Sequence, residues 1–359
     1  LSGGSSVTAT LDFSLTAEPV NPDQLADFSA EGPNVDGSIK PDLVAVGMHV
    51  YTAAQNSDPQ GILYDASRYA VVDGTSFSSP LVAGSAALLK AARPGLTVAQ
   101  YRSLLINSAG PAYFAPNIPA RVQQAGAGLL DMSAALRASG AEAPTSLAFG
   151  IGTATTQQTR TLTISNVTNA RETFTILVAG RDMPTGPVPP ESRTAMALET
   201  SAPLVTVSTH SLTLEGGASG TVTVGFSSFG LPAGAYEGFI RVLGTNSNVE
   251  QRVPYWYGVG STVPVRITIL STPTNPKAGA LDTDSVLFRV TDASGITVPG
   301  VQPKATVVDG GGQVVSVEND DPFFPGVFGL TLQYGPVAGS NDFQIQVGNL
   351  TQTVTIVTQ

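Results

Sequence analysis

A short segment from Val71 to Gly84 carries the residues whose types and spacing are best suited to chemistry. It reads VVDGTSFSSPLVAG: an apolar run ends in Asp-Gly, and Thr75 and Ser76 then open a long apolar stretch. Glycine permits a tight turn with the backbone close to a bound group. A serine at a helix start lies where unpaired N–H groups and the positive dipole end favour a developing negative charge. A nucleophilic serine that attacks a carbonyl needs this arrangement, and an ordinary N-cap serine is the alternative interpretation.

Residues 74–84, GTSFSSPLVAG, closely resemble the serine motif of the subtilisin-like serine proteases (subtilases), commonly written GTSMAxPHVAG. Phe77 and Ser78 stand in place of Met-Ala, and Leu81 stands in place of His. Two more blocks are similar to the family in the same order. Residues 27–47 resemble the FSSRGP…KPDIxAPG segment, and residues 125–136 resemble the G-x-G-hh-(N/D)-x-x-A-A stretch near the end of the family domain.

The resemblance implies that Ser76 is a catalytic nucleophile and that Gly74, Thr75 and Pro80 support its turn. It also implies the fold class: a multidomain chain with the C-terminal portion of an α/β subtilisin-like domain, followed by two all-β antiparallel sandwiches. The substrate would be a protein or peptide, and neither a cofactor nor a metal is implied.

The partners that such a serine needs are not visible in this sequence. A serine requires a base and usually a carboxylate that orients the base. In the family the Asp, His and oxyanion Asn motifs precede the serine by a long stretch, whereas 75 residues precede Ser76 here and contain none of them. Together with Leu1 in place of an initiator Met, this predicts the C-terminal part of a longer protease, inactive without its N-terminal part.

Four residues are candidates to substitute for these partners. His49 and His210 are the only histidines, and we expect neither to serve Ser76. Asp73 is too close to Ser76 in sequence to stand behind a histidine, so it is interpreted as a turn residue. Asp42 is expected to hold a loop by hydrogen bonds. Asn319 to Asp321 lack the alternating ligands of a calcium loop and are interpreted as solvated.

Composition narrows the class of protein. The 359 residues include 38 Gly and 26 Pro with only 12% charged residues, which is typical of a β-rich chain with packed cores. The net charge of −10 argues against a nucleic-acid partner, because phosphate binding needs clustered Lys and Arg. No apolar run approaches the ~18–20 residues of a membrane span. The absence of Cys excludes disulfides and a cysteine nucleophile, and it is compatible with a secreted or cell-surface location.

Hydrophobic patterns predict the elements that position the motif. Residues 43–46 and 69–72 read as short buried strands, and residues 80–92 read as a buried helix that Pro94 and Gly95 end. Thr97 is expected to cap a helix through Asn107, and residues 131–138 form another helix. We assign residues 1–140 to the subtilisin-like part.

Helical periodicity stops near residue 141. Short runs rich in Val, Ile, Thr and aromatic residues, separated by Gly, Pro and Asn, predict a fibronectin type III-like sandwich over residues 141–262 and an immunoglobulin-like sandwich over residues 263–359. The proline-rich residues 183–192 are predicted to form a loop. Trp256, the single Trp, is interpreted as a core aromatic, with sugar stacking as the alternative.

These observations favour a secreted, bacterial-type subtilisin-like endopeptidase that forms an acyl-enzyme on Ser76. The alternatives are a non-catalytic surface or adhesion module built on a protease-derived scaffold, and a pseudo-protease.

Overall fold

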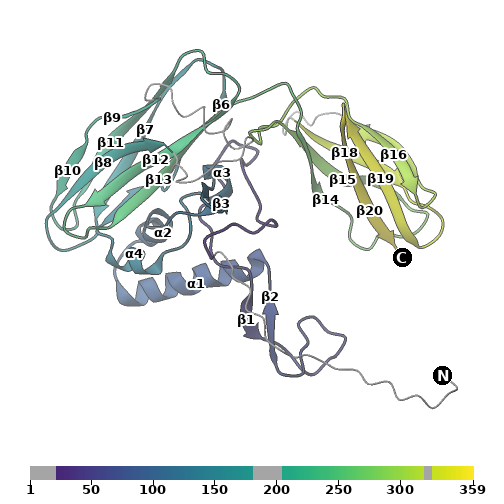
Figure 1. Ribbon diagram of the computed structural model, residues 1–359, viewed down its shortest axis with the longest axis horizontal. Coiled ribbons are helices and arrows are strands. Elements are labelled where there is room, and N and C mark those ends of the chain that lie inside the picture. The colour runs from purple at the N-terminus through teal and green to yellow at the C-terminus, as the bar shows by residue number, and fades with distance from the viewer. Residues whose placement is uncertain (1–21, 181–203, 319–325) are drawn as a thin grey trace, which may run out of the picture.

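The computed structural model describes residues 22–180, 204–318 and 326–359. The loops expected at 183–192 and 319–321 lie outside these ranges. Within these ranges most regular structure is β-strand, arranged in several sheets, and the described helices lie within residues 75–137 (Figure 1). Three parts follow along the chain: a helical part (residues 22–139), a first β unit (140–259) and a second β unit (266–358).

The helical part contains four helices and two small antiparallel strand pairs among its described residues. The helices are α1 (Thr75–Ala92), α2 (Val98–Asn107), α3 (Val122–Ala125) and α4 (Met132–Arg137). The strand pairs are β1 (Val50–Ala53) with β2 (Tyr69–Val72), and β3 (Tyr113–Ala115) with β4 (Ile118–Pro119).

Side-chain caps fix the starts of α2 and α4. The Thr97 hydroxyl accepts from the Gln100 amide at 3.2 Å, and the Gln100 side chain accepts from the Thr97 amide at 2.8 Å. This reciprocal arrangement satisfies two amides that an uncapped helix start would leave open. Asp131 caps α4 by accepting from the Ala134 amide at 2.9 Å. The start of α2 therefore agrees with the sequence-based expectation, and α4 begins one residue later than expected.

The helix expected at 80–92 exists, but the expectation that it is buried was wrong. It begins earlier, at Thr75, and of its 18 residues only Leu89 is buried. Leu88 is 64% exposed and Leu81 is also exposed. The expectation of burial came from the apolar composition of the helix. In the described part of the chain, however, other elements pack against α1 on one side only.

The strand expected at 43–46 does not form, and the strand at 69–72 is not buried. Val44 makes a single isolated parallel bridge to Leu129, because no neighbouring strand continues the ladder on either side. Residues 69–72 do form β2, with the expected bounds, but Val71 is 63% exposed. The β1–β2 pair is a two-stranded ribbon that leaves apolar side chains uncovered.

The first β unit consists of two sheets that face one core. Their strands are β5 (Gly140–Ala143), β6 (Leu147–Gly152), β7 (Thr156–Asn166), β8 (Glu172–Gly180), β9 (Val205–Val207), β10 (Ser211–Leu214), β11 (Ser219–Ser228), β12 (Gly234–Gly244) and β13 (Glu250–Val259). The orders are β10-β8-β12-β13-β6 and β5-β7-β11-β9. Phe149, Phe226 and Tyr257 pack together inside, with Phe226 4.8 Å from Tyr257 between ring centroids.

One pairing in this unit departs from the all-antiparallel expectation. Strand β6 runs parallel to β13, with Leu147 opposite Tyr255, while the other pairs are antiparallel. Parallel neighbours need a long connection rather than a hairpin. Here about a hundred residues separate the two strands, so short-range sequence patterns carry no signal for their pairing.

The second β unit has a separate core between two further sheets. Its strands are β14 (Arg266–Ser271), β15 (Leu281–Thr291), β16 (Lys304–Asp309), β17 (Gln313–Glu318), β18 (Val327–Gln333), β19 (Gly339–Val347) and β20 (Leu350–Thr358). The orders are β14-β15-β18-β17 and β16-β19-β20. Phe288 and Phe328 stack at 5.4 Å within this core.

A turn of the second β unit joins the other two parts. Ile296 is buried in a cluster with Ile39 and Val122 of the helical part and with Phe239 and Trp256 of the first β unit. The Asp292 carboxylate shapes this turn by accepting from the amides of Ser294 and Ile296, at 2.8 and 3.0 Å. Trp256 is fully buried, which excludes sugar stacking and confirms its interpretation as a core residue.

Two arginines of the second β unit add polar contacts to this joint. Arg289 Nη1 donates to the Pro33 carbonyl at 3.1 Å, and Arg266 Nη1 lies 3.5 Å from Glu31 Oε2. All three parts therefore meet at one place, around Ile296.

Candidate active site

Ser76 lies at the start of α1, directly after the turn that follows β2. Gly74 is the residue before the helix and has φ 150° and ψ 150°, a backbone conformation that glycine adopts without strain. Helix α1 begins at Thr75, so Ser76 is its second residue, and its side chain is exposed. The turn at Gly74 and the helix start at Thr75 thus place the Ser76 hydroxyl on the surface at a helix N-terminus.

The electrostatics of this helix start suit a negative charge. No side chain caps it, and its first turn contains no acidic residue. The amides at the start of α1 therefore leave the positive end of the helix dipole available to a negatively charged group. Pro80, one turn further along, has no N–H to donate to the Ser76 carbonyl, so it leaves the regular helical pattern incomplete at the serine itself.

A contact between two glycines holds the serine turn. The Gly74 amide donates to the Gly47 carbonyl at 2.7 Å. A Cβ atom on Gly47 would lie 2.8 Å from the Gly74 carbonyl oxygen and would also collide with the Ser78 hydroxyl. Gly47 therefore has to be glycine for the two segments to approach. Sequence reasoning included Gly47 in the segment 27–47 but assigned it no role.

The three motif blocks meet in space. The Val44 amide donates to the Gly128 carbonyl at 2.9 Å, and the Leu130 amide donates to the Val44 carbonyl at 2.8 Å. Through Gly47, the same segment reaches the serine turn. The segment after Asp42 is thus fixed on one side by residues 127–130 and on the other by the serine motif.

Neither histidine is brought to Ser76. The His49 amide donates to Asp73 Oδ1 at 2.6 Å, which uses Asp73 in the turn as predicted. His210 lies in the first β unit, with Nδ1 3.0 Å from the Ile176 carbonyl oxygen. Across the described ranges, no hydrogen bond or ion pair joins either imidazole ring to Ser76.

Asp42 lies away from the serine, in a cluster of charged side chains. Its carboxylate accepts from Lys40 Nζ at 2.9 Å and from Arg102 Nη2 at 3.0 Å. These two ion pairs connect the segment after Pro41 to α2, in line with a loop-holding role.

Strongly perturbed acidity is found elsewhere in the molecule. Burial raises the pKa of Glu142 to about 7, although the Ser103 hydroxyl bonded to its carboxylate opposes the rise. Glu142 lies in β5, at the seam between α2 and the first β unit. The side-chain partners of Glu142 are Ser103 and Gln251, and among the described residues no hydrogen bond joins it to Ser76.

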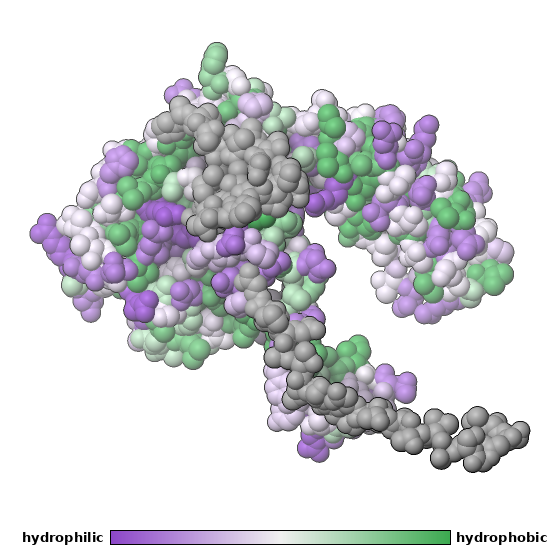
Figure 2. Space-filling model, in the orientation of Figure 1, coloured by the Kyte–Doolittle hydropathy of each residue, from purple (hydrophilic) through white to green (hydrophobic). Residues whose placement is uncertain are grey.

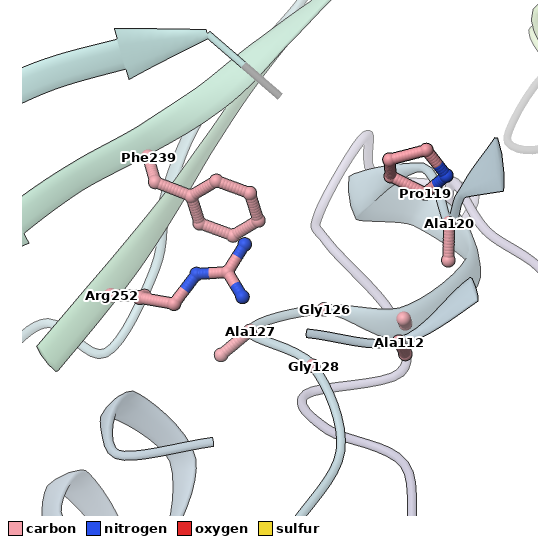
Figure 3. Close-up of a pocket in the computed structure, with 9 residues that line it drawn as sticks. Ala112, Pro119, Ala120, Gly126, Ala127, Gly128, Phe239 and Arg252 are labelled. Atoms are coloured by element: carbon pink, nitrogen blue, oxygen red, sulfur yellow. The ribbon is translucent and has the colours of Figure 1, made fainter. Parts of the chain in front are cut away.

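Two cavities lie between the helical part and the first β unit. One is very small and lies between Phe239, Arg252 and the turn formed by Gly126, Ala127 and Gly128 (Figure 3). The other, of about 420 Å³, borders α4 and the ends of β12 and β13. Neither includes Ser76. In the described part of the chain, no group of three or more His, Asp or Glu side chains is placed to hold a metal ion.

Comparisons with known proteins point to one family. The model of the subtilase family matches residues 5–183. The minor extracellular protease Vpr of Bacillus subtilis is 31% identical over 177 residues, which cover 46% of this chain and 20% of Vpr. The subtilisin-like protease SBT1.2 of Arabidopsis thaliana is 38% identical over 116 residues, which cover 29% of this chain and 15% of that protein. The matched stretches thus span a fifth or less of these relatives' lengths.

Solved structures add no argument about the fold. The ASH/PapD-like domain of human CEP192 aligns with 34% of this chain and 84% of its own at 17% identity, with a TM-score of 0.25. The helices among the described residues include none long and apolar enough to cross a membrane. With the serine motif at an open helix start and the family match spanning it, the first half of this chain, residues 5–183, belongs to the subtilase family.

Proposed function

We propose that this chain is the serine-bearing part of a subtilisin-like endopeptidase, with Ser76 as the nucleophile and Gly74, Thr75 and Pro80 as the supports of its turn. The observation that carries the proposal is the exposed Ser76 hydroxyl at the uncapped N-terminus of α1, within a region that matches the subtilase family. The helix amides there favour the oxyanion that forms during attack on a carbonyl.

The reaction would proceed in two steps. Ser76 Oγ bonds to the carbonyl carbon of a peptide while a base removes its proton. The C–N bond then breaks, and the amine leaves with that proton. Water hydrolyses the resulting ester, releases the acyl product and restores the hydroxyl. The base, its orienting carboxylate and an oxyanion amide are proposed to come from a part of the protease upstream of this sequence.

The exposed surface of the helical part supports the proposal that an upstream part of the protease packs against it. Apolar side chains of α1, of the β1–β2 ribbon and of the preceding segment are exposed: Val46, Met48, Tyr51, Tyr69, Val71, Leu81 and Leu88. Figure 2 shows hydrophobic side chains reaching the surface over α1 and near the ribbon. Surfaces of this kind mark interaction sites. We propose that the N-terminal part of the same catalytic domain covers them.

Gly84 fits the same proposal. It lies in the interior of α1, where glycine costs about 1 kcal/mol relative to alanine. Nothing described in this chain lies within 4 Å of where its Cβ would be. A glycine without a close neighbour is explained if another backbone approaches α1 there in the complete domain.

We further propose that residues 1–140 complete such a catalytic domain and that residues 141–262 and 263–359 are sandwich domains of the fibronectin type III-like and immunoglobulin-like kinds. Shared cores between facing sheets support this division. A secreted or cell-surface location is proposed from the relative named as an extracellular protease.

Fluorophosphonate labelling tests the proposal. The probe is applied to this chain and to a version extended upstream, and the labelled residue is identified by peptide mapping. We expect labelling at Ser76 in the extended protein only, with casein hydrolysis that Ser76→Ala abolishes. In subtilisin, loss of the serine lowers turnover by about 10⁶-fold, and a comparable loss is expected.

Ser79→Ala is the matched control, because Ser79 is another exposed serine in the same helix. It should leave labelling unchanged. An extended protein that neither labels nor hydrolyses casein would overturn the proposal and favour a non-catalytic surface module. Labelling of the present chain by itself would overturn the assignment of the base to an upstream part.

A further inference from the structure

A closed loop of residues 32–40 precedes the segment that supports the serine turn. Its two ends lie against each other, because a Cβ atom on Gly32 would be only 2.6 Å from the Lys40 carbonyl oxygen. Gln123 of α3 holds both ends. Its backbone carbonyl accepts from the Gly32 amide at 2.7 Å, and its Oε1 atom accepts from the Lys40 amide at 3.2 Å. Compact loops with closed ends are frequently functional.

The loop is buried at three points, and these points face different parts of the molecule. Pro33, Gly37 and Ile39 are buried, whereas the loop residues around them are exposed or partly exposed. A Cβ atom on Gly37 would lie 3.3 Å from the Cα atom of Gly150, so the loop contacts β6 of the first β unit there. Ile39 packs in the cluster around Ile296. The loop is therefore fixed by distant elements as well as by its own ends.

The second β unit contacts the loop through an arginine and a turn. Arg289 Nη1 donates to the Pro33 carbonyl at 3.1 Å. In the turn, a Cβ atom on Gly295 would lie 3.1 Å from Pro33 Cδ, and the next residue, Ile296, is buried with Ile39. These contacts form only when the second β unit is docked, so its docking helps to fix the loop.

The loop leads directly into the segment that carries the serine turn. The Asp42 carbonyl accepts from the Ala127 amide at 3.0 Å, and Val44 is bonded to residues 128 and 130. The Gly47 carbonyl then accepts from the Gly74 amide. Coupling between separate places in a fold is carried by packed side chains and hydrogen bonds of this continuous kind. A displaced loop is therefore expected to displace Gly47 and the serine turn.

The residues on which this segment rests are anchored at the same place. Residues 127–130 follow α3, and Val122 of α3 belongs to the cluster around Ile296. Arg121, which precedes α3, also donates from Nη2 to the Ser294 carbonyl at 3.5 Å. Loss of the Ile296 side chain would therefore loosen both the segment after the loop and its support.

We propose that the second β unit is a positioning element for the serine turn and that it acts on the loop of residues 32–40 through Ile296 and Arg289. Docking of the unit fixes the loop, the loop fixes residues 41–47, and Gly47 fixes the turn that presents Ser76. The consequence for catalysis rests on the proposed function of Ser76 as a nucleophile. The mechanical link itself can be measured in this chain.

Amide hydrogen exchange of the 359-residue chain tests the mechanical link. Ile296→Ala removes the side chain at the joint, and Val354→Ala is the matched control, because Val354 is buried in the core of the second β unit alone. We expect exchange over residues 41–47 and at the Gly74 amide to rise about tenfold or more in Ile296→Ala. Exchange there should stay at the parental rate in Val354→Ala.

A second pair of variants tests the polar contact without removing an apolar side chain. Arg289→Gln removes the donor to the Pro33 carbonyl, and we expect exchange over residues 41–47 to rise about three- to tenfold. Arg160→Gln, on an exposed position of β7, changes the net charge equally and should leave exchange unchanged.

Kinetics of an upstream-extended protease test the consequence for Ser76. We expect Ile296→Ala to lower kcat about tenfold or more and to leave KM within about twofold, because misplaced reacting groups slow the chemistry without removing substrate contacts. Ile296→Val retains most of the side chain and should retain most of kcat, and Val354→Ala should retain all of it.

The outcomes separate this proposal from the proposed function. Parental exchange over residues 41–47 in both Ile296→Ala and Arg289→Gln would overturn the mechanical link, and so would equal acceleration in Val354→Ala. Faster exchange with unchanged kcat in an active extended protein would overturn the link to Ser76. A parental extended protein without activity would contradict the proposed function instead, while the exchange rates would still decide whether the second β unit positions the serine turn.

Discussion

Helix α1 and strand β13 are both rich in apolar residues, yet they are buried to opposite degrees. Of the 18 residues of α1 only Leu89 is buried, whereas β13 buries nine of its ten residues. Strand β13 has neighbours on both sides, a core on one face and the helical part on the other. Helix α1 meets α2 and α4 on one side only.

The comparison shows that an apolar sequence identifies side chains that burial would stabilise, whereas the neighbouring elements decide whether those side chains are buried. The first β unit buries its own apolar side chains, because its two sheets pack over a common core. The helical part leaves many apolar side chains exposed, in line with the proposal that another part of the protease covers them. Stability measured in this chain should therefore be set by the β units.

The sharpest test of this comparison is a pair of truncations. Phe226→Ala removes a fully buried ring from the first core, and we expect a loss of about 3–5 kcal/mol in unfolding free energy. Leu88→Ala removes an exposed side chain, and we expect a change within about 0.5 kcal/mol. Urea denaturation followed by tryptophan fluorescence measures both. Equal losses from the two variants would contradict the comparison.

The seam between the two regions should make stability depend on pH. Burial raises the pKa of Glu142 from 4.5 to about 7. The folded protein therefore binds more protons than the unfolded chain between these values, and this contribution to stability is lost as the pH rises through about 7. The loss amounts to about 3 kcal/mol, from 1.36 kcal/mol per pKa unit. Denaturant titrations at pH 5 and pH 8 measure it.

Glu142→Gln is the control for this pH effect. It keeps the side-chain shape beside Ser103 and Gln251 but cannot ionise. We expect a flatter pH profile and higher stability than the parent at pH 8. A profile as steep as that of the parent would assign the pH dependence to other groups.

A smaller effect is expected at the start of α2. Thr97→Ala removes the hydroxyl that accepts from the Gln100 amide but keeps the backbone amide that donates to the Gln100 side chain, and we expect a loss of about 1 kcal/mol. Thr97→Ser retains the hydroxyl and should retain most of the stability. Thermal unfolding of the two variants side by side distinguishes the cap from the loss of the threonine methyl group.

The smallest effect has the opposite sign. Gly84→Ala fills open space in the interior of α1, so this chain should gain about 0.5–1 kcal/mol. Ala87→Gly, at another exposed position of the helix, should lose a similar amount. In an upstream-extended protease the sign for Gly84→Ala should reverse if a second backbone packs there. Helix content by circular dichroism and unfolding free energy check both.

Features set by neighbours in sequence could be predicted, and features set by distant partners could not. Thr97 caps α2 through a residue three positions away, so its role could be predicted from the sequence. Asp131 was expected inside a helix over residues 131–138 and is instead the residue that caps α4. Strands β8, β11 and β19 follow a local alternation of apolar and polar residues, so strands in these regions could be predicted. The exposure of Val71 and Leu88 and the parallel β6–β13 pair depend on what the rest of the fold supplies, which no local pattern records.

The same division holds for the candidate site. Ser76 and Gly74 stand in one continuous motif, and the structure places them as a turn and a helix start, but whether Ser76 acts as a nucleophile stays a prediction. Gly47 is 27 positions before Gly74, and only the close approach of the two backbones reveals its role.

The cluster around Ile296 has a consequence for the order of biosynthesis. Its other members include Ile39 and Val122, made early, and Phe239 and Trp256, made later, while Ile296 follows Trp256 by 40 positions. At about 5–20 residues per second on the ribosome, that interval lasts several seconds. Throughout it, the apolar surfaces that later enclose Ile296 stay uncovered on the nascent chain. Synthesis order thus makes closure of this cluster one of the last steps of maturation, and the interval before it is the period in which a chaperone would have most to bind.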